Sequence, residues 1–225
     1  MKRALLTAAL VAIASTASAQ TIVGTKHDLS TTSTASFTMP LTKSATTNQI
    51  CIFCHTPHNP TVPVPLWNRT NPAATGWAMY NSPTISATAK AKLALGNFDA
   101  DSISLFCMSC HDGVTTMGAF SNHADLGADA TGVIPGTSTA NIGDAGTDLS
   151  NDHPVGFNYN TAATEDTGLH TLADAQTSLG GSAFFGSTGQ MIECASCHKV
   201  HDNASAPFLR KTNAASALCL ACHDK

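Results

Sequence analysis

The chain has 225 residues, of which 12 % are charged, with a formal net charge of −4 and eight cysteines. It contains no basic tract, so nucleic acid is excluded as an expected partner. Leu, Ile, Val and Phe make up just under a fifth of the residues, which is little for an ordinary core, yet the low charge leaves the disorder pattern incomplete. We therefore expect something other than side chains to supply part of the core.

The first 19 residues have the pattern of a secretory signal peptide. Lys2 and Arg3 precede an apolar stretch over residues 4–14, and ASA at 17–19 is a typical cleavage sequence. The stretch is shorter than the roughly 20 residues that a membrane helix needs, and no later run approaches that length. We expect export without a membrane span, to the cell surface or the extracellular space, alternatively to the periplasm.

Regular structure is expected to be scarce, and strand patterns are weak throughout. A segment rich in Gly, Ala, Thr and Asp predicts a long loop at residues 112–150. Helical patterns are short and rich in Ala, Leu and Lys, or follow a cysteine motif. In chain order, the expected helices and helical turns are residues 51–58, 84–95, 102–111, 194–201 and 213–223.

Four copies of the motif C-x-x-C-H contain all eight cysteines. This motif attaches c-type haem: its cysteines form thioethers with the porphyrin, and its histidine binds the iron. The sequence therefore predicts four covalently bound haem c groups. The expected attachment residues are Cys51, Cys54, Cys107, Cys110, Cys194, Cys197, Cys219 and Cys222, and the expected proximal iron ligands are His55, His111, His198 and His223.

Zinc and disulfides are the alternative uses of these cysteines. Structural zinc often uses C-x-x-C pairs about 15–20 residues apart, and the interval between Cys197 and Cys219 is near that range, whereas Cys54 and Cys107 are much further apart. Export would permit disulfides. Neither alternative explains a histidine after every cysteine pair, so haem is the favoured interpretation.

Bound haem would also supply the missing core. Each macrocycle is a large apolar plate, so cofactor area replaces side-chain area removed from water, and folding should be inseparable from cofactor attachment. The expected fold class is a multihaem cytochrome c that is mostly irregular, with a few short α-helices, little or no sheet, and a chain of four haems around which it packs.

Two further histidines each follow a motif histidine by three residues: His58 after His55, and His201 after His198. If the motif continues as a helical turn, residues i and i+3 share one face. They then cannot approach one iron from opposite sides. We expect His58 and His201 to bind neighbouring irons, most simply those of His111 and His223; the alternative is a solvated side chain.

The chain has the pattern of an internal duplication. PLWNRTN (65–71) and SLFCMSCHD (104–112) match PFLRKTN (207–213) and SALCLACHD (216–224) in the second copy. No fixed short period is present, so this is a doubling and not a repeat array. The two halves are expected at residues 20–135 and 136–225, forming one continuous haem-packed unit.

Each half also offers a histidine before its first motif, His27 and His153. Four irons with two histidines each require eight, and the duplicated pattern supplies that number. His123 and His170 fall outside the pattern. The expected distal ligands are His27, His58, His153 and His201.

The paired motif CHTPHN (54–59), PLWNR (65–69) and DLS with DHPVGF (148–157) resemble the outer-surface multihaem cytochromes of metal-reducing bacteria. In particular they are similar to the tetrahaem OmcE-type cytochromes that polymerise into filaments. The likeness covers nearly all of the mature chain. It implies a continuous row of haems with bis-histidine ligation, supports the eight histidines named above, and implies that a ligand can come from the next subunit.

These features predict an electron carrier and not an enzyme, because eight histidines are enough to close all four irons. The leading hypothesis is extracellular electron transfer by a homopolymer, with His27 reaching the next subunit or, alternatively, an iron of its own chain. The alternatives are a monomeric periplasmic shuttle and a multihaem reductase. The expected partners are redox proteins, extracellular electron acceptors and further copies of the chain.

Overall fold

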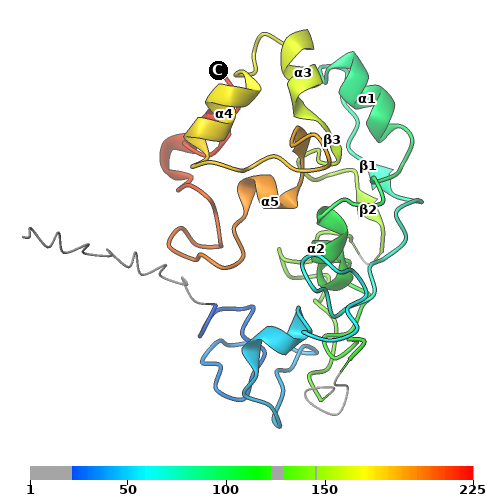
Figure 1. Cartoon of the computed structure of the whole chain (residues 1–225), viewed down its shortest axis with the longest axis vertical. Helices are drawn as coiled ribbons and strands as arrows, with labels where there is room; N and C mark the ends of the chain where they lie inside the picture. The colour runs from blue at the N-terminus through cyan, green and yellow to red at the C-terminus, as the bar shows by residue number, and fades with distance from the viewer. Residues whose placement is uncertain (1–21, 123–128, 145, 225) are drawn as a thin grey trace, which may run out of the picture.

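The computed structural model describes residues 22–122, 129–144 and 146–224. The predicted signal peptide lies outside these residues. In Figure 1 the blue N-terminal segment lies at one end of the long axis. The helices of residues 87–93, 159–165 and 172–178 lie at the other end, and those of residues 104–111 and 194–197 lie between. Within the described residues, no helix is long and apolar enough to cross a membrane.

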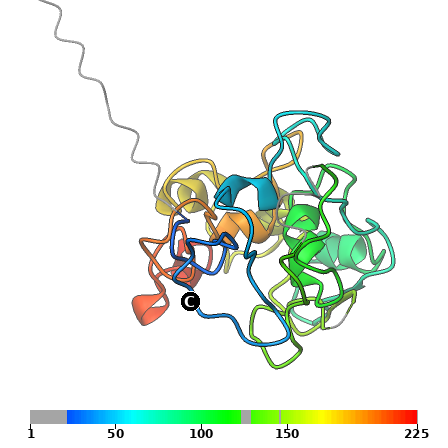
Figure 2. The same cartoon turned by 90° about the horizontal axis from the view of Figure 1, so that it is seen from below.

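Helices and strands are few and short, as Figures 1 and 2 show, and irregular chain connects them. This confirms the predicted fold class. Two small sheets are present in the described residues: β1 pairs with β2 in parallel, and β3 pairs with β4 in antiparallel orientation. The elements are η1 (Ile50–Phe53), β1 (Ala78–Met79), α1 (Ala87–Leu93), α2 (Ser104–His111), β2 (Asp148–Leu149), β3 (Phe157–Asn158), α3 (Tyr159–Glu165), α4 (Leu172–Ser178), β4 (Met191–Ile192), α5 (Cys194–Cys197), η2 (Ala214–Ser216) and η3 (Cys219–Ala221).

The helices expected at 84–95 and 102–111 are present as α1 and α2, and two further helices were not expected. The Asn158 side chain accepts a hydrogen bond from the backbone N–H of Thr161 at the start of α3. Thr171 does the same for Asp174 at the start of α4. These N-caps satisfy otherwise free backbone donors. Asn158 and Thr171 are therefore the sequence features from which α3 and α4 could have been predicted.

Three helical expectations were wrong. The turn expected at residues 51–58 is shorter, because η1 ends at Phe53. Residues 213–223 form two 3-10 turns, η2 and η3, because Ala215 and Ser216 have φ angles of 51° and 60°. The turn after the third motif ends early: α5 stops at Cys197, and His198 is extended with φ −109° and ψ 148°. His198 and His201 therefore do not share one helical face.

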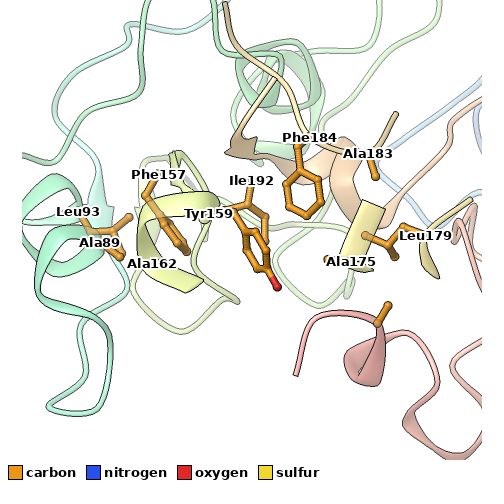
Figure 3. Close-up of a cluster of buried hydrophobic side chains, with 11 residues drawn as sticks. Ala89, Leu93, Phe157, Tyr159, Ala162, Ala175, Leu179, Ala183, Phe184 and Ile192 are labelled. Atoms are coloured by element: carbon orange, nitrogen blue, oxygen red, sulfur yellow. The ribbon is translucent and has the colours of Figure 1, made fainter. Parts of the chain in front are cut away.

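The protein core is divided into three small clusters of buried side chains. Figure 3 shows the largest, in which Ala89 and Leu93 of α1 lie beside Phe157 and Ala162, and Tyr159 packs with Phe184. Helix α1 comes from the first predicted half, whereas Tyr159 and Phe184 come from the second. The same cluster includes Ala221 of η3, so it supports the fourth motif. The boundary between the halves at residue 135 stays a prediction.

Candidate haem sites

Each C-x-x-C-H motif lies on a single turn of helix, and all eight cysteines are unpaired. In three motifs the backbone N–H of the histidine donates to the carbonyl of the first cysteine, at 2.8 Å for His55, 3.1 Å for His198 and 3.0 Å for His223. His111 is the last residue of α2. A common local backbone thus presents two thiols and one imidazole, which is the donor set that covalent haem requires.

Consecutive motifs lie next to one another in space. Burial raises the pKa of Cys54 to about 12, and the neighbouring Cys110 is the next largest cause. Cys107 and Cys194 are likewise close neighbours, because each shifts the pKa of the other. In the second half, burial raises the pKa of Cys197 to about 11, with Cys222 as the next cause. The four motifs therefore follow one another in space in their sequence order.

A buried carboxylate joins the second and third motifs. Glu193 is 1 % exposed and accepts hydrogen bonds from the Ser102 hydroxyl at 2.6 Å, from the Ser104 backbone N–H at 3.3 Å and from the Ser104 hydroxyl. The Ser104 hydroxyl in turn accepts from the backbone N–H of Cys194 at 3.0 Å. Burial raises the pKa of Glu193. This network fixes α5 against α2.

Three of the four motif histidines have one ring nitrogen bound to a backbone carbonyl. Nδ1 lies 2.7 Å from the Pro65 carbonyl oxygen in His55, 2.6 Å from that of Ala140 in His111, and 3.1 Å from that of Pro207 in His198. A carbonyl only accepts, so Nδ1 carries the proton and Nε2 is left for a metal. Histidine ligands of metals are typically oriented in this way. Pro65 and Pro207 are equivalent in the predicted duplication.

Six histidines form three facing pairs. For two imidazoles that bind one iron from opposite sides, metal–nitrogen bonds of about 2.0 Å and a ring centre about 1.1 Å behind each nitrogen give centroids about 6.2 Å apart. The observed centroid distances are 6.0 Å for His27 and His111, 6.0 Å for His55 and His201, and 6.3 Å for His153 and His223. The residues present therefore fit bis-histidine haem at three positions.

These neighbours differ from those that sequence spacing suggested. The structure places His201 beside His55 instead of His223, and His111 faces His27 instead of His58. The His27 ring also stacks on Phe208, with centroids 4.5 Å apart and an interplanar angle of 12°. His27 thus lies inside its own chain, between the first half and the loop that follows the third motif.

Two of the predicted ligands have no histidine neighbour of this kind in the described part of the chain. His58 is exposed, and neither its ring nor that of His198 has a ring contact there. His123 lies outside the described residues. The His170 backbone N–H donates to the Cys222 carbonyl at 2.8 Å, so the backbone of His170 contacts the fourth motif.

A buried donor beside the first motif lacks an acceptor. The Trp67 indole Nε1 has no hydrogen-bond partner, and the ring lies 5.9 Å from His55 and 4.9 Å from Phe106 between centroids. A buried indole N–H normally finds a partner. A cofactor with carboxylate groups would supply one, so this atom also fits haem. Sequence reasoning offered no signal for it.

Residues 188–225 match the family model described as "Doubled CXXCH motif", and this segment contains the third and fourth motifs. No curated protein matches the chain. The match supports a multihaem c-type cytochrome, a class of electron-transfer protein, and the paired motif implies covalently bound haem c. The first two motifs lie outside the matched segment.

Proposed function

We propose that this protein is an exported tetrahaem electron carrier in which histidine closes both axial positions of every iron. The observation that carries the proposal is the set of three histidine pairs at the spacing of axial ligands. Attached haem supplies a one-electron iron couple with no open coordination position. Bis-histidine ligation favours electron transfer over catalysis, because a substrate needs a free position on the metal.

The assignment of ligands follows from the facing pairs. His201 is the distal ligand for the first motif, His27 for the second, and His153 for the fourth. Three distal histidine–iron bonds of this kind would connect segments that are far apart in the sequence. They would hold the chain together and also influence the reduction potential of the iron. The carbonyls bound to the Nδ1 atoms of His55, His111 and His198 orient these rings.

The contacts between consecutive motifs support a single conducting row. Cys107 and Cys194 are close electrostatic neighbours, and so are Cys54 with Cys110 and Cys197 with Cys222. Attachment points this close give each of the four sites at least one adjacent site. Electrons entering at one end of the molecule would then have a route to the other without a mobile carrier.

The third site supports polymerisation as the finer proposal. Among the described residues the His198 ring has no ring contact with another histidine, while His58 is exposed. We assign His58 of one copy to the His198 iron of the next. Such a contact is heterologous and produces an open filament when the rotation between copies does not close. This assignment replaces His27 as the ligand shared between copies.

Two measurements on the exported protein test the proposal. Electron microscopy of the secreted fraction is expected to show filaments, whereas isolated particles would favour a monomeric periplasmic shuttle. Carbon monoxide added to the reduced protein is expected to leave the spectrum unchanged. Stoichiometric binding of carbon monoxide would establish an open iron and favour a multihaem reductase.

A further inference from the structure

Arg69 is the most deeply buried cation among the described residues, with 1 % of its surface exposed. Its Nε and Nη2 donate to the Ser109 carbonyl at 3.2 and 3.0 Å. Nη1 donates to the Met117 carbonyl at 2.8 Å, and Nη2 also donates to the Thr116 carbonyl at 2.7 Å. Backbone carbonyls therefore surround the guanidinium.

This cation has no carboxylate partner in the described part of the chain, where the ion pairs join Lys92 to Asp99 and Lys199 to Asp202. Burying a charge is costly unless hydrogen bonds compensate for it, and charge-assisted bonds to carbonyl dipoles do so here. Arginine does not lose its proton in proteins. The site therefore holds a permanent positive charge that no acidic group neutralises directly.

Arg69 lies between the first and second motifs. Ser109, which accepts two of its bonds, immediately precedes Cys110, and the neighbouring Asn68 donates its backbone N–H to the Cys54 carbonyl at 2.9 Å. Burial raises the pKa of Cys110, and the Arg69 charge is the largest opposing influence, ahead of the effect of Asp112. The same charge lowers the pKa of Cys54 against the effect of burial. A positive field therefore acts on both attachment sites.

The second half has its cations in less buried places. The duplicated segments align Arg69 with Lys211, which donates to the Ser178 hydroxyl at 3.1 Å and is partly exposed. The neighbouring Arg210 is also partly exposed, and its Nε donates to the Ala195 carbonyl of the third motif at 2.7 Å. Among the described residues, only the first half therefore contains a fully buried cation.

We propose that Arg69 is a fixed internal cation that raises the reduction potentials of the haems attached at the first and second motifs. The inference rests on the proposed haem attachment. A ferrous iron has one positive charge fewer than a ferric one, so a nearby cation in a low-dielectric interior favours the reduced state. The guanidinium makes four hydrogen bonds to backbone carbonyls, so Arg69 would act on the haems through space and not as a ligand.

The test is a spectroelectrochemical titration of the holoprotein. Arg69→Met is expected to move the part of the curve that belongs to the haems of the first and second motifs downwards, with the reduced-to-oxidised ratio at the wild-type midpoint falling on the order of tenfold, or 59 mV for a one-electron couple. Arg69→Lys keeps the charge and is expected to retain most of the potential. Lys211→Met is the matched control and should leave the curve unchanged.

A second pair of variants leaves Arg69 in place, should its removal prevent folding. Thr116 is exposed and its carbonyl binds the guanidinium. Thr116→Asp should lower the same potentials relative to Thr116→Asn, which has nearly the same shape without the charge. Superimposable curves for Thr116→Asp and Thr116→Asn would overturn the inference. So would superimposable curves for wild type and a folded Arg69→Met variant with full haem content. Absence of haem from the wild type would instead overturn the proposed function.

Discussion

The imidazoles of His55 and His201 are neighbours, with ring centroids 6.0 Å apart and ring planes inclined by 29°. One belongs to the first cysteine motif and the other follows the third. If they share an iron, as we propose, the two halves of the chain are connected through the metal. The pair therefore provides a direct test of the ligand assignment.

His201→Ala is expected to convert one of the four haems from low spin to high spin, with haem content unchanged. The iron would keep His55 and the two thioethers and lose only its distal ligand. Electron paramagnetic resonance of the oxidised protein measures the change. His170→Ala is the matched control, because the contact of His170 at the fourth motif is made by its backbone. An unaltered low-spin spectrum for His201→Ala would remove this assignment.

His58→Ala is expected to give dispersed protomers in place of filaments, because the shared ligand is lost while the three ligand pairs within the chain remain. Each protomer should have one high-spin haem, that of the third motif. Electron microscopy and size-exclusion chromatography measure the assembly state. Filaments of normal length from this variant would contradict the role of His58. His27→Ala should also create one high-spin haem but should leave filaments intact.

The mature protein should keep its colour after denaturation. Four thioether-linked haems predict a mass above that of the polypeptide by four haem groups, and no thiol available for alkylation. Mass spectrometry of the denatured protein checks both. A chromophore that passes into acidified acetone would contradict covalent attachment. A mass increase of fewer than four haems would limit the conclusion to the motifs that were occupied.

Glu193→Gln is expected to change how stability depends on pH. Burial raises the folded-state pKa of Glu193, so the folded state holds the proton more tightly than the unfolded state. Its contribution to stability is fully present below the unfolded pKa of about 4.3 and is lost as the pH rises through the folded value. Glutamine cannot titrate, so the variant should lose less stability than wild type between pH 4 and neutrality.

Thermal unfolding of the holoprotein at several pH values measures this difference. Glu165→Gln is the control, because Glu165 is exposed and hydrogen bonds from Thr88 lower its pKa. The contribution of Glu165 to stability should rise with pH instead of falling, and it should be small. Parallel pH profiles for wild type and Glu193→Gln would show that the buried carboxyl group is not the source.

Tyr159→Phe is expected to destabilise the protein by about 1–2 kcal/mol. The Tyr159 ring is buried in the cluster of Figure 3, and its hydroxyl donates to the carbonyls of His170 and Cys222 at 2.8 and 3.2 Å. Removing the hydroxyl takes one donor from the carbonyls of His170 and Cys222 next to the fourth motif, although the Cys222 carbonyl still accepts from the His170 N–H. Tyr80→Phe, at a partly exposed position, should have a much smaller effect. Chemical denaturation measures both, and equal effects would contradict this role.

Much of the fold class could be predicted because it depends on composition and local pattern. Few branched apolar residues and many short polar segments predicted sparse helices, and α1 and α2 were located from their Ala, Leu and Lys content. Helices α3 and α4 were missed, although Asn158 and Thr171 are ordinary N-caps. Their stability comes from packing of α3 with α1 and of α4 with η3, contacts that a local pattern does not reveal.

The sequence by itself determined the chemistry of the motifs, because two cysteines and a histidine within five residues lie on one turn of backbone whatever surrounds them. It did not determine which histidines face each other. That depended on where α5 ends: the extended backbone at His198 carries His201 away from its own motif and towards His55. Ligands on opposite sides of one metal come from separate segments, so only the packing of those segments, which places His27 against His111 and His153 against His223, could decide the pairs.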